Sequence, residues 1–123
     1  GRVSGCKAKQ GEEILKKMFA MDSGASMLGE VALVPKESPI NRSGLLFMNT
    51  LFDENACCHV AVGEGFQEVI EGAENMTLDE IHALGVNDSI IHVDFMIGSD
   101  DLDITGICED GTEIPVFRNG TWA

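Results

Sequence analysis

The clearest pattern along the chain is the mostly apolar stretch 90–97, which contains two polar side chains, His92 and Asp94. A short apolar run rich in β-branched residues predicts a strand. Side chains alternate between the two faces of a strand, so His92 and Asp94 share one face, about 7 Å apart along the strand. Burying an imidazole and a carboxylate together is costly without a partner. A divalent metal ion is one such partner, and a simple His–Asp hydrogen bond is the other.

Helical patterns mark two segments of the chain. From Gln10 to about Met21, apolar residues fall at helical spacing and charged residues occupy the opposite face, which predicts an amphipathic helix. Thr77 and Glu80 have the spacing of a capping box, which predicts a short helix to about Leu84. This second helix carries His82, which we interpret as a surface residue.

Two apolar segments in the first half of the chain predict strands. Val31–Val34 is expected to form a short buried strand that Pro35 closes. Leu45–Met48 is expected to form a second strand, and Lys36–Gly44 a loop between the two. Asp53 follows the second segment, where we expect it to cap a helix.

The rest of the chain predicts one ambiguous segment, a loop and a hairpin. Glu54–Val62 fits either a tightly packed helix or a buried strand, and Glu68–Asn75 is expected to be a loop. Leu102–Ile107 and Thr112–Phe117 flank an Asp-Gly turn, which predicts a β-hairpin. The order of elements favours an α+β fold with a mixed, largely antiparallel sheet and two or three helices.

Length, charge and cysteine usage narrow the possible functions. The 123 residues suffice for one domain, and the net charge of −13 argues against partners such as nucleic acid or an anionic membrane surface. Acidic groups can instead attract cations or positively charged amino termini. The four cysteines lack a C-x-x-C spacing, and we interpret them as reduced thiols of a cytoplasmic protein. The chain does not begin with Met, so we expect it to be a piece of a longer protein.

Two further polar side chains lie in apolar surroundings. His59 follows small apolar residues, where a structural hydrogen bond is the commoner explanation, and Glu30 lies at the start of the first expected strand. With His92 and Asp94 they supply two imidazoles and two carboxylates, a donor set that suits zinc, cobalt or manganese. A two-metal site needs about five or six protein ligands. Spacing alone therefore supports a one-metal site or an incomplete two-metal site.

Four segments of the chain resemble the thermophilic-aminopeptidase family of metallopeptidases. They are Leu28–Pro35, Asn49–His59, Gly85–Gly98 and Phe117–Ala123, so the resemblance extends over nearly the whole chain. It implies a cytosolic, homodimeric exopeptidase that removes amino-terminal residues from peptides with two divalent ions (zinc, cobalt or magnesium). It also implies that residues 1–123 form the C-terminal catalytic segment of a two-domain enzyme, whose N-terminal domain is absent from this chain.

The resemblance also implies which residues bind metal. Carried over residue by residue, the family's metal ligands fall on Glu30, His59, His92 and Asp94. One further glutamate ligand would lie before Gly1, and a tyrosine ligand of the family's pattern falls on Phe66, which has no oxygen to offer.

Several functional expectations follow from this carry-over. Glu30 is a candidate general base and Glu54 a weaker one, while Asp53 and Asn55 are expected to orient the ligating imidazoles. Because a ligand and a domain are missing, we expect the 123 residues alone to be inactive. The alternative is a non-catalytic dimerisation or assembly module, in which the histidines and carboxylates are structural, and Phe66 favours this alternative.

Overall fold

The computed structural model describes residues 1–123, which form two compact units. The first unit combines Gly1–Val31 with Val60–Asp94, and the second combines Ala32–His59 with Phe95–Ala123. Four α-helices and two three-stranded sheets make up the fold, which confirms the predicted α+β class with more helices than expected. None of the helices combines the length and the hydrophobicity that crossing a membrane requires.

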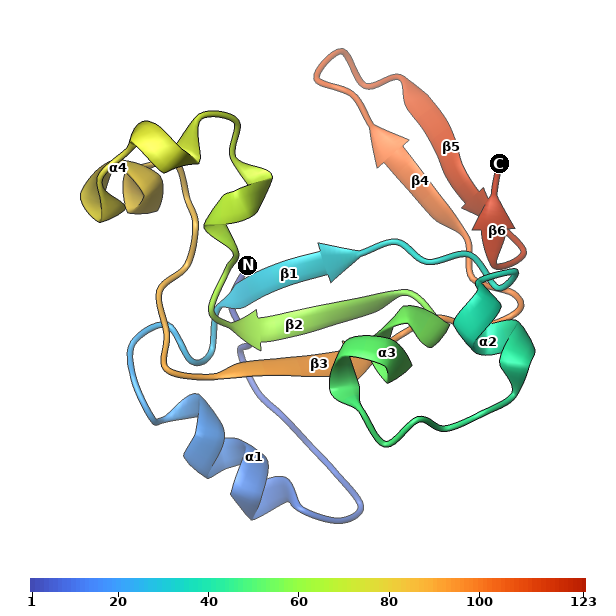
Figure 1. The fold of residues 1–123 in the computed structure, drawn as a ribbon, viewed down its shortest axis with the longest axis horizontal. Helices are drawn as coiled ribbons and strands as arrows, with labels where there is room; N and C mark the ends of the chain where they lie inside the picture. The colour runs from blue at the N-terminus through green and yellow to red at the C-terminus, as the bar shows by residue number, and fades with distance from the viewer. The chain divides into compact units, whose positions relative to one another are not determined.

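The first sheet carries the residues of interest. It consists of β1 (Leu28–Ala32), β2 (His59–Gly63) and β3 (His92–Met96), with β2 in the middle. Figure 1 shows each strand running opposite to its neighbour. The Glu64 N–H donates to the Ile91 carbonyl at 2.6 Å, which ties the end of β2 to the start of β3. The predicted strand around His92 is therefore confirmed.

The first strand begins earlier than its apolar pattern predicts. β1 covers Leu28–Ala32, whereas the prediction was a buried strand over Val31–Val34, and Val31 is 64% exposed. Backbone pairing sets the start of the strand, because the carbonyl of Met27 accepts a hydrogen bond from Gly63 N at 2.9 Å. The apolar pattern of the sequence alone could not predict where this backbone pairing begins.

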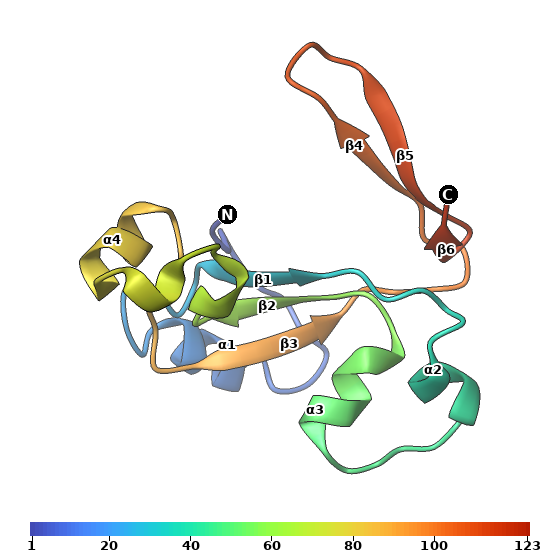
Figure 2. The same cartoon turned by 45° about the horizontal axis from the view of Figure 1, so that its top comes forward.

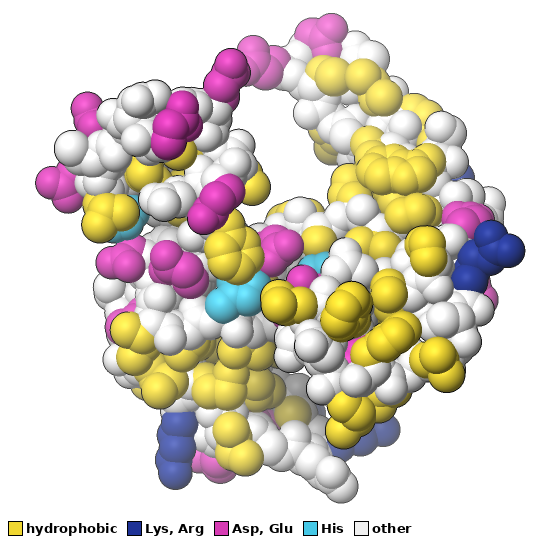
Figure 3. All heavy atoms as spheres, viewed as in Figure 1, with side chains coloured by type: hydrophobic (Ala, Val, Ile, Leu, Met, Phe, Trp, Pro, Cys, Tyr) yellow, Lys and Arg dark blue, Asp and Glu magenta, His cyan; other side chains and the backbone are white.

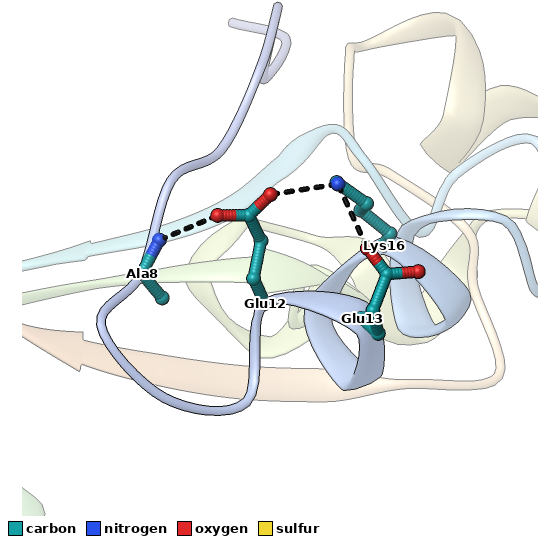
Figure 4. A network of polar contacts seen from close by, with 4 residues as sticks. All are labelled: Ala8, Glu12, Glu13 and Lys16. Atoms are coloured by element: carbon teal, nitrogen blue, oxygen red, sulfur yellow. Dashed lines mark hydrogen bonds and ion pairs between the residues drawn. The ribbon is translucent and has the colours of Figure 1, made fainter.

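An exposed helix lies near the start of the first unit. α1 (Glu12–Phe19) confirms the predicted amphipathic helix with shorter ends. Lys16 Nζ lies 2.7 Å from a carboxylate oxygen of Glu12 and 2.9 Å from one of Glu13, as Figure 4 shows. Glu12 also accepts the N–H of Ala8 at 3.1 Å. The Lys16 ammonium and then the Ala8 N–H lower the pKa of Glu12.

The segment between β2 and β3 consists of short helices. η2 (Gln67–Val69) and η3 (Ala73–Asn75) are single 3₁₀ turns in the stretch that was expected to be a loop. α4 (Leu78–Ala83) follows and confirms the predicted helix. Its capping box is complete, because Thr77 accepts from the Glu80 N–H and the Glu80 carboxylate accepts from the Thr77 N–H at 2.8 Å.

The second unit contains the predicted hairpin. β4 (Ile104–Ile107), β5 (Glu113–Arg118) and β6 (Thr121–Trp122) form an antiparallel sheet in that order, and Figure 2 shows β4 and β5 as a long hairpin. Phe117 is fully buried and packs edge-on against the Trp122 ring, with 4.5 Å between ring centroids. The Asp-Gly turn signal therefore predicts both the element and its pairing.

The second unit contains three short helices before β2, of which the first two were not predicted. α2 (Pro39–Ser43) lies inside the expected loop, where Ser38 accepts the N–H of Ile40 as an N-cap. α3 (Thr50–Asp53) and η1 (Glu54–Ala56) precede β2. The two alternatives for the ambiguous segment therefore each hold for part of it, since a helical turn comes first and a strand follows.

The predicted strand over Leu45–Met48 is wrong. The segment has no strand partner, and its side chains are exposed, up to 84% for Met48. Met48 has a φ of +55°, which a strand does not allow. Asp53 does not cap a helix as expected, since its carboxylate reaches back to the N–H groups of Phe47 at 2.8 Å and Asn49 at 3.0 Å. Local turn chemistry therefore outweighs the apolar pattern here.

Candidate metal centre

The first unit brings three of the four predicted ligands together. His92 Nε2 lies 3.1 Å from Glu30 Oε2 and 3.3 Å from Asp94 Oδ1. The strand period already places His92 and Asp94 on one face of β3, whereas Glu30 reaches them from β1. The sequence pattern therefore accounts for two of these side chains, and the sheet supplies the third.

The backbone of Glu64 sets the orientation of the His92 ring. His92 Nδ1 lies 2.8 Å from the Glu64 carbonyl oxygen, and because a carbonyl oxygen only accepts, Nδ1 donates. In the neutral ring, Nε2 then carries the lone pair, and this nitrogen faces Glu30 and Asp94. A lone pair opposite two carboxylates is unfavourable. The arrangement therefore needs either a second proton on the ring or a cation between the three side chains.

Asp94 holds a buried oxygen that lacks a hydrogen-bond donor. This atom is Oδ1, and the Asp94 side chain is 8% exposed compared with 29% for Glu30. Leaving a buried carboxylate oxygen without a donor costs stability, so a native protein normally gives it a partner. Two carboxylates and one imidazole nitrogen form a donor set that zinc and similar divalent ions accept. The residues present therefore fit a divalent ion, which Glu30, His92 and Asp94 would hold.

A polar network holds the start of β3. Asp22 Oδ2 accepts from Ser89 Oγ at 3.0 Å and from Ile90 N at 2.9 Å, while Oδ1 accepts two N–H groups of its own turn. The Ile90 N–H makes the largest contribution to lowering the pKa of Asp22. The Glu64 carboxylate accepts the Ser89 N–H at 2.6 Å. Glu64 therefore holds both Ser89, through its side chain, and His92, through its carbonyl.

Sequence reasoning missed this network. Asn87 adds to it by donating to the carbonyls of Gly24 at 3.0 Å and Gly63 at 2.5 Å. Asp22 binds two N–H groups of its own turn. All the other contacts of this network join residues that lie 24 to 68 positions apart in the chain. In the sequence, Asp22 and Asn87 carry only the turn signals of Asp and Asn near small residues. No local pattern could have linked them to His92.

Phe66 packs directly on the imidazole of the centre. The ring centroids of Phe66 and His92 lie 4.7 Å apart, with the planes tilted by 43°. The Phe66 side chain is 47% exposed. It offers no ligand oxygen, and its contact with the centre is an apolar one.

His59 belongs to the second unit and is the first residue of β2. It is buried, and its Nδ1 lies 3.0 Å from the Cys57 carbonyl oxygen. The same reasoning as for His92 makes Nδ1 the donor and gives Nε2 the lone pair of the neutral ring. Its role as a fourth ligand stays a prediction.

Two polar residues near His59 do not have the contacts that we expected. Asp53 bonds to the backbone of its own segment, as described above, and Asn55 Nδ2 donates to the Leu51 carbonyl at 3.0 Å. These bonds shape α3 and the loop before it, where we had expected them to orient imidazoles. The backbone carbonyls of Glu64 and Cys57 orient the two histidines instead.

Comparison with known proteins gives a consistent family assignment. Residues 1–122 match the family described as thermophilic metalloprotease (M29). The chain is 54% identical over all 123 residues to Aminopeptidase AmpS of Bacillus subtilis (strain 168) and covers 30% of that protein. It is 50% identical to Aminopeptidase T of Thermus aquaticus over 115 residues, which are 94% of this chain and 28% of that protein.

A solved structure shares the fold. Wild-type AmpT from Thermus thermophilus matches with a TM-score of 0.84 and 47% identity, over 99% of this chain and 30% of that chain. The chain therefore spans about 30% of the length of the relatives that it matches. Because the family match extends over nearly every residue, the chain belongs to the thermophilic metalloprotease (M29) family.

Proposed function

We propose that this chain is the metal-binding, catalytic segment of a two-metal-dependent aminopeptidase that removes amino-terminal residues from peptides. The observation that carries the proposal is the buried Asp94 Oδ1, which lacks a hydrogen-bond donor and lies 3.3 Å from His92 Nε2. Membership of a metalloprotease family and relatives named as aminopeptidases support the reaction class. In this proposal zinc, cobalt or magnesium ions are held by Glu30, His59, His92 and Asp94.

The side chains of the centre differ in exposure, and we assign their roles in the reaction accordingly. A backbone carbonyl accepts from Nδ1 of each histidine, so in the neutral rings Nε2 is the nitrogen that would bind a metal ion. When bound, the ions supply Lewis acidity that polarises the peptide carbonyl and a water molecule. Asp94 is nearly inaccessible and holds its position, whereas Glu30 is 29% exposed. Glu30 is therefore our candidate for accepting a proton from water.

The charge of the chain suits a substrate with a free amino terminus. The net charge is −13, and Figure 3 shows a histidine with acidic and hydrophobic side chains beside it. An acidic surface raises the local concentration of a protonated amine. On the resemblance and the cysteine pattern, the proposal also includes a homodimer in the reducing cytoplasm.

The first test measures zinc affinity by calorimetry on the full natural chain that carries this sequence, after its metal has been removed with a chelator. Wild-type protein, His92→Ala and the matched control His82→Ala are compared, because His82 is an exposed histidine on α4. We expect His92→Ala to lower zinc affinity by roughly 100-fold or more and His82→Ala to leave it unchanged. Release of amino acids from a dipeptide panel should stop with the chelator and with His92→Ala.

Two outcomes would contradict the proposal. Equal zinc affinity in the two variants would remove His92 from the metal centre. Hydrolysis that continues at the wild-type rate in His92→Ala would show that the reaction does not use this cluster.

A second candidate function is a non-catalytic dimerisation or assembly module. It is favoured by the segment Leu45–Phe52, in which six large apolar side chains are exposed. His92→Ala separates the two candidates. Lost hydrolysis with unchanged dimerisation supports the catalytic segment, whereas lost dimerisation with unchanged specific activity supports the module.

A further inference from the structure

The backbone at the end of β2 lies very close to Gly29 of β1. A β-carbon at Gly29 would lie 2.2 Å from the Glu64 carbonyl oxygen and 2.4 Å from the Gly63 carbonyl oxygen. Ordinary contacts of a β-carbon begin at 3.4 Å, so neither distance leaves room for a side chain. The chain leaves β2 at Gly63, whose φ of +98° favours glycine. Glycine inside a strand often marks such a close approach of two backbones.

One of these two carbonyls orients the imidazole of the candidate centre. The Glu64 oxygen accepts from His92 Nδ1 at 2.8 Å. In the neutral ring, this bond leaves Nε2 with its lone pair towards Glu30 and Asp94. Gly29 is also the residue directly before Glu30 in β1. Gly29 therefore contacts the acceptor of the ring and is bonded to the residue that supplies a carboxylate.

Hydrogen bonds to the residues before β3 hold the Glu64 peptide in place. The Glu64 N–H donates to the Ile91 carbonyl at 2.6 Å, and the Gly65 N–H donates to the Asn87 carbonyl at 2.9 Å. Asn87 Nδ2 donates to the Gly63 carbonyl at 2.5 Å. The Glu64 carbonyl is therefore fixed by its neighbours on both sides along the chain, and a displacement of it strains these bonds.

We propose that Gly29 is a positioning residue of the metal centre, because the absence of a side chain there lets the Glu64 carbonyl hold His92. The inference rests on the proposed function only for its effect on the reaction. With an alanine at position 29, the β-carbon and the Glu64 oxygen must separate by about 1 Å to reach ordinary contact. Glu64 lies just outside β2, whereas Gly29 lies within β1, so we expect the Glu64 peptide to move.

A displaced Glu64 carbonyl changes which nitrogen of His92 carries the proton. Without that acceptor, the neutral ring gains more by donating from Nε2 to Asp94. Asp94 Oδ1 lies 3.3 Å away and is the buried oxygen that lacks a donor. The proton then occupies the nitrogen that would bind a metal ion. Gly29→Ala should therefore weaken metal binding although it removes no ligand.

The test uses the full natural chain that carries this sequence, first without metal and then titrated with zinc. The ¹⁵N NMR signals of the histidine rings report which nitrogen is protonated, and His92→Ala identifies the signals of His92. With the ring neutral, we expect Nδ1–H in the wild type and Nε2–H in Gly29→Ala. Calorimetry should show zinc affinity lower by roughly tenfold or more in Gly29→Ala. A purely structural role of Gly29 would lower the stability and leave the tautomer unchanged.

Two other glycines provide matched controls. Gly106→Ala adds the same methyl group within β4, where its nearest neighbours lie at 3.6 and 3.7 Å, so it should match the wild type in both measurements. Gly120→Ala belongs to the second unit, and its β-carbon would lie 2.6 Å from the Ser99 carbonyl oxygen at a φ of +75°. It should lower the melting temperature and leave the tautomer of His92 unchanged.

Gly65→Ala covers the case in which Gly29→Ala does not fold. Its β-carbon would lie 3.3 Å from the Gly29 carbonyl oxygen and 3.2 Å from the Asn87 nitrogen. The same segments then have to shift by only a few tenths of an ångström. We expect a mixture of the two His92 tautomers and a zinc affinity that is several-fold lower.

The outcomes separate the position of His92 from the reaction. If Gly29→Ala, or Gly65→Ala in its place, keeps Nδ1–H or binds zinc as the wild type does, the inference is overturned and the aminopeptidase stands. A tautomer that also changes in Gly120→Ala would overturn it too, because lost stability alone would then move the ring. A changed tautomer and weaker zinc binding, in a protein whose wild type hydrolyses no dipeptide, would support the inference and overturn the proposed function.

Discussion

The start of β3 in the first unit and the segment Gly44–Asp53 in the second both use a carboxylate to hold backbone N–H groups. They differ in how far along the chain that carboxylate reaches. Asp22 binds partners 67 and 68 positions away, whereas Asp53 reaches back only 4 and 6 positions. The first arrangement orders the strand that carries His92. The second orders a loop whose apolar side chains are exposed.

This difference indicates what each kind of contact does. A carboxylate that joins distant segments fixes the relative position of two parts of the sheet, so its loss should affect every residue held there. A carboxylate that binds its own loop fixes only that loop, so its loss should stay local. Substitutions in three places, at Asp22, at Asp53 and in the ion-pair cluster of α1, test this distinction, from the largest expected effect to the smallest.

Asp22→Ala should have the largest effect. It removes the acceptor for Ser89 Oγ and for three N–H groups, including that of Ile90. We expect the melting temperature by circular dichroism to fall by roughly 5–10 °C. Zinc affinity should fall about tenfold, because the strand that carries His92 is no longer held in place. Asp22→Asn can keep one acceptor oxygen and should lie between wild type and Asp22→Ala. An unchanged zinc affinity in Asp22→Ala would break the link between the network and the centre.

The pH dependence of the same substitution sharpens the result. Hydrogen bonds, mainly from the Ile90 N–H, lower the pKa of Asp22 from 3.8. The folded protein therefore binds this proton more weakly than the unfolded chain, and the ionised carboxylate stabilises the fold above the unfolded pKa. That contribution is lost as the pH falls through the lowered pKa. The difference in melting temperature between wild type and Asp22→Asn should be constant from about pH 5 to 7 and shrink below pH 3.8. A difference that grows on acidification would contradict this assignment.

The same distinction explains how much of the molecule could be predicted from its sequence. Local patterns predicted the strand with His92, the Asp110-Gly111 hairpin and the capped helix, because a period, a turn or a cap is complete within a few residues. The strand predicted over Leu45–Met48 was wrong, because the prediction took apolar side chains to be buried, and these are exposed. Glu30 was a candidate ligand both from its place before an apolar strand and from the resemblance, but no local pattern placed it beside His92. The Asp22 network was predicted from neither source. These depend on long-range pairing that no local pattern encodes.

Asp53→Ala should have a smaller and local effect. It frees the N–H groups of Phe47 and Asn49, each of which now has a carboxylate partner. We expect a loss of about 1 kcal/mol in the free energy of unfolding. Hydrogen exchange should become faster at these two amides while the amides of β3 keep their protection. Zinc affinity should not change, and a loss as large as that in Asp22→Ala would remove the distinction between long-range and local contacts.

The exposed cluster on α1 should give the smallest effect and separates two kinds of local contact (Figure 4). Lys16→Met removes only exposed ion pairs, with Glu12 and Glu13. Exposed pairs of this kind contribute little and are screened by salt. The melting temperature of Lys16→Met should therefore equal that of the wild type within experimental scatter, and the difference between the two should not change when salt is added. Glu12→Met removes the same pair and also the acceptor for the Ala8 N–H. It should therefore lower the melting temperature measurably more than Lys16→Met. Equal effects would mean that the hydrogen bond to the Ala8 N–H adds nothing to the contribution of the ion pairs, and carboxylates could no longer be ranked by the backbone groups that they bind.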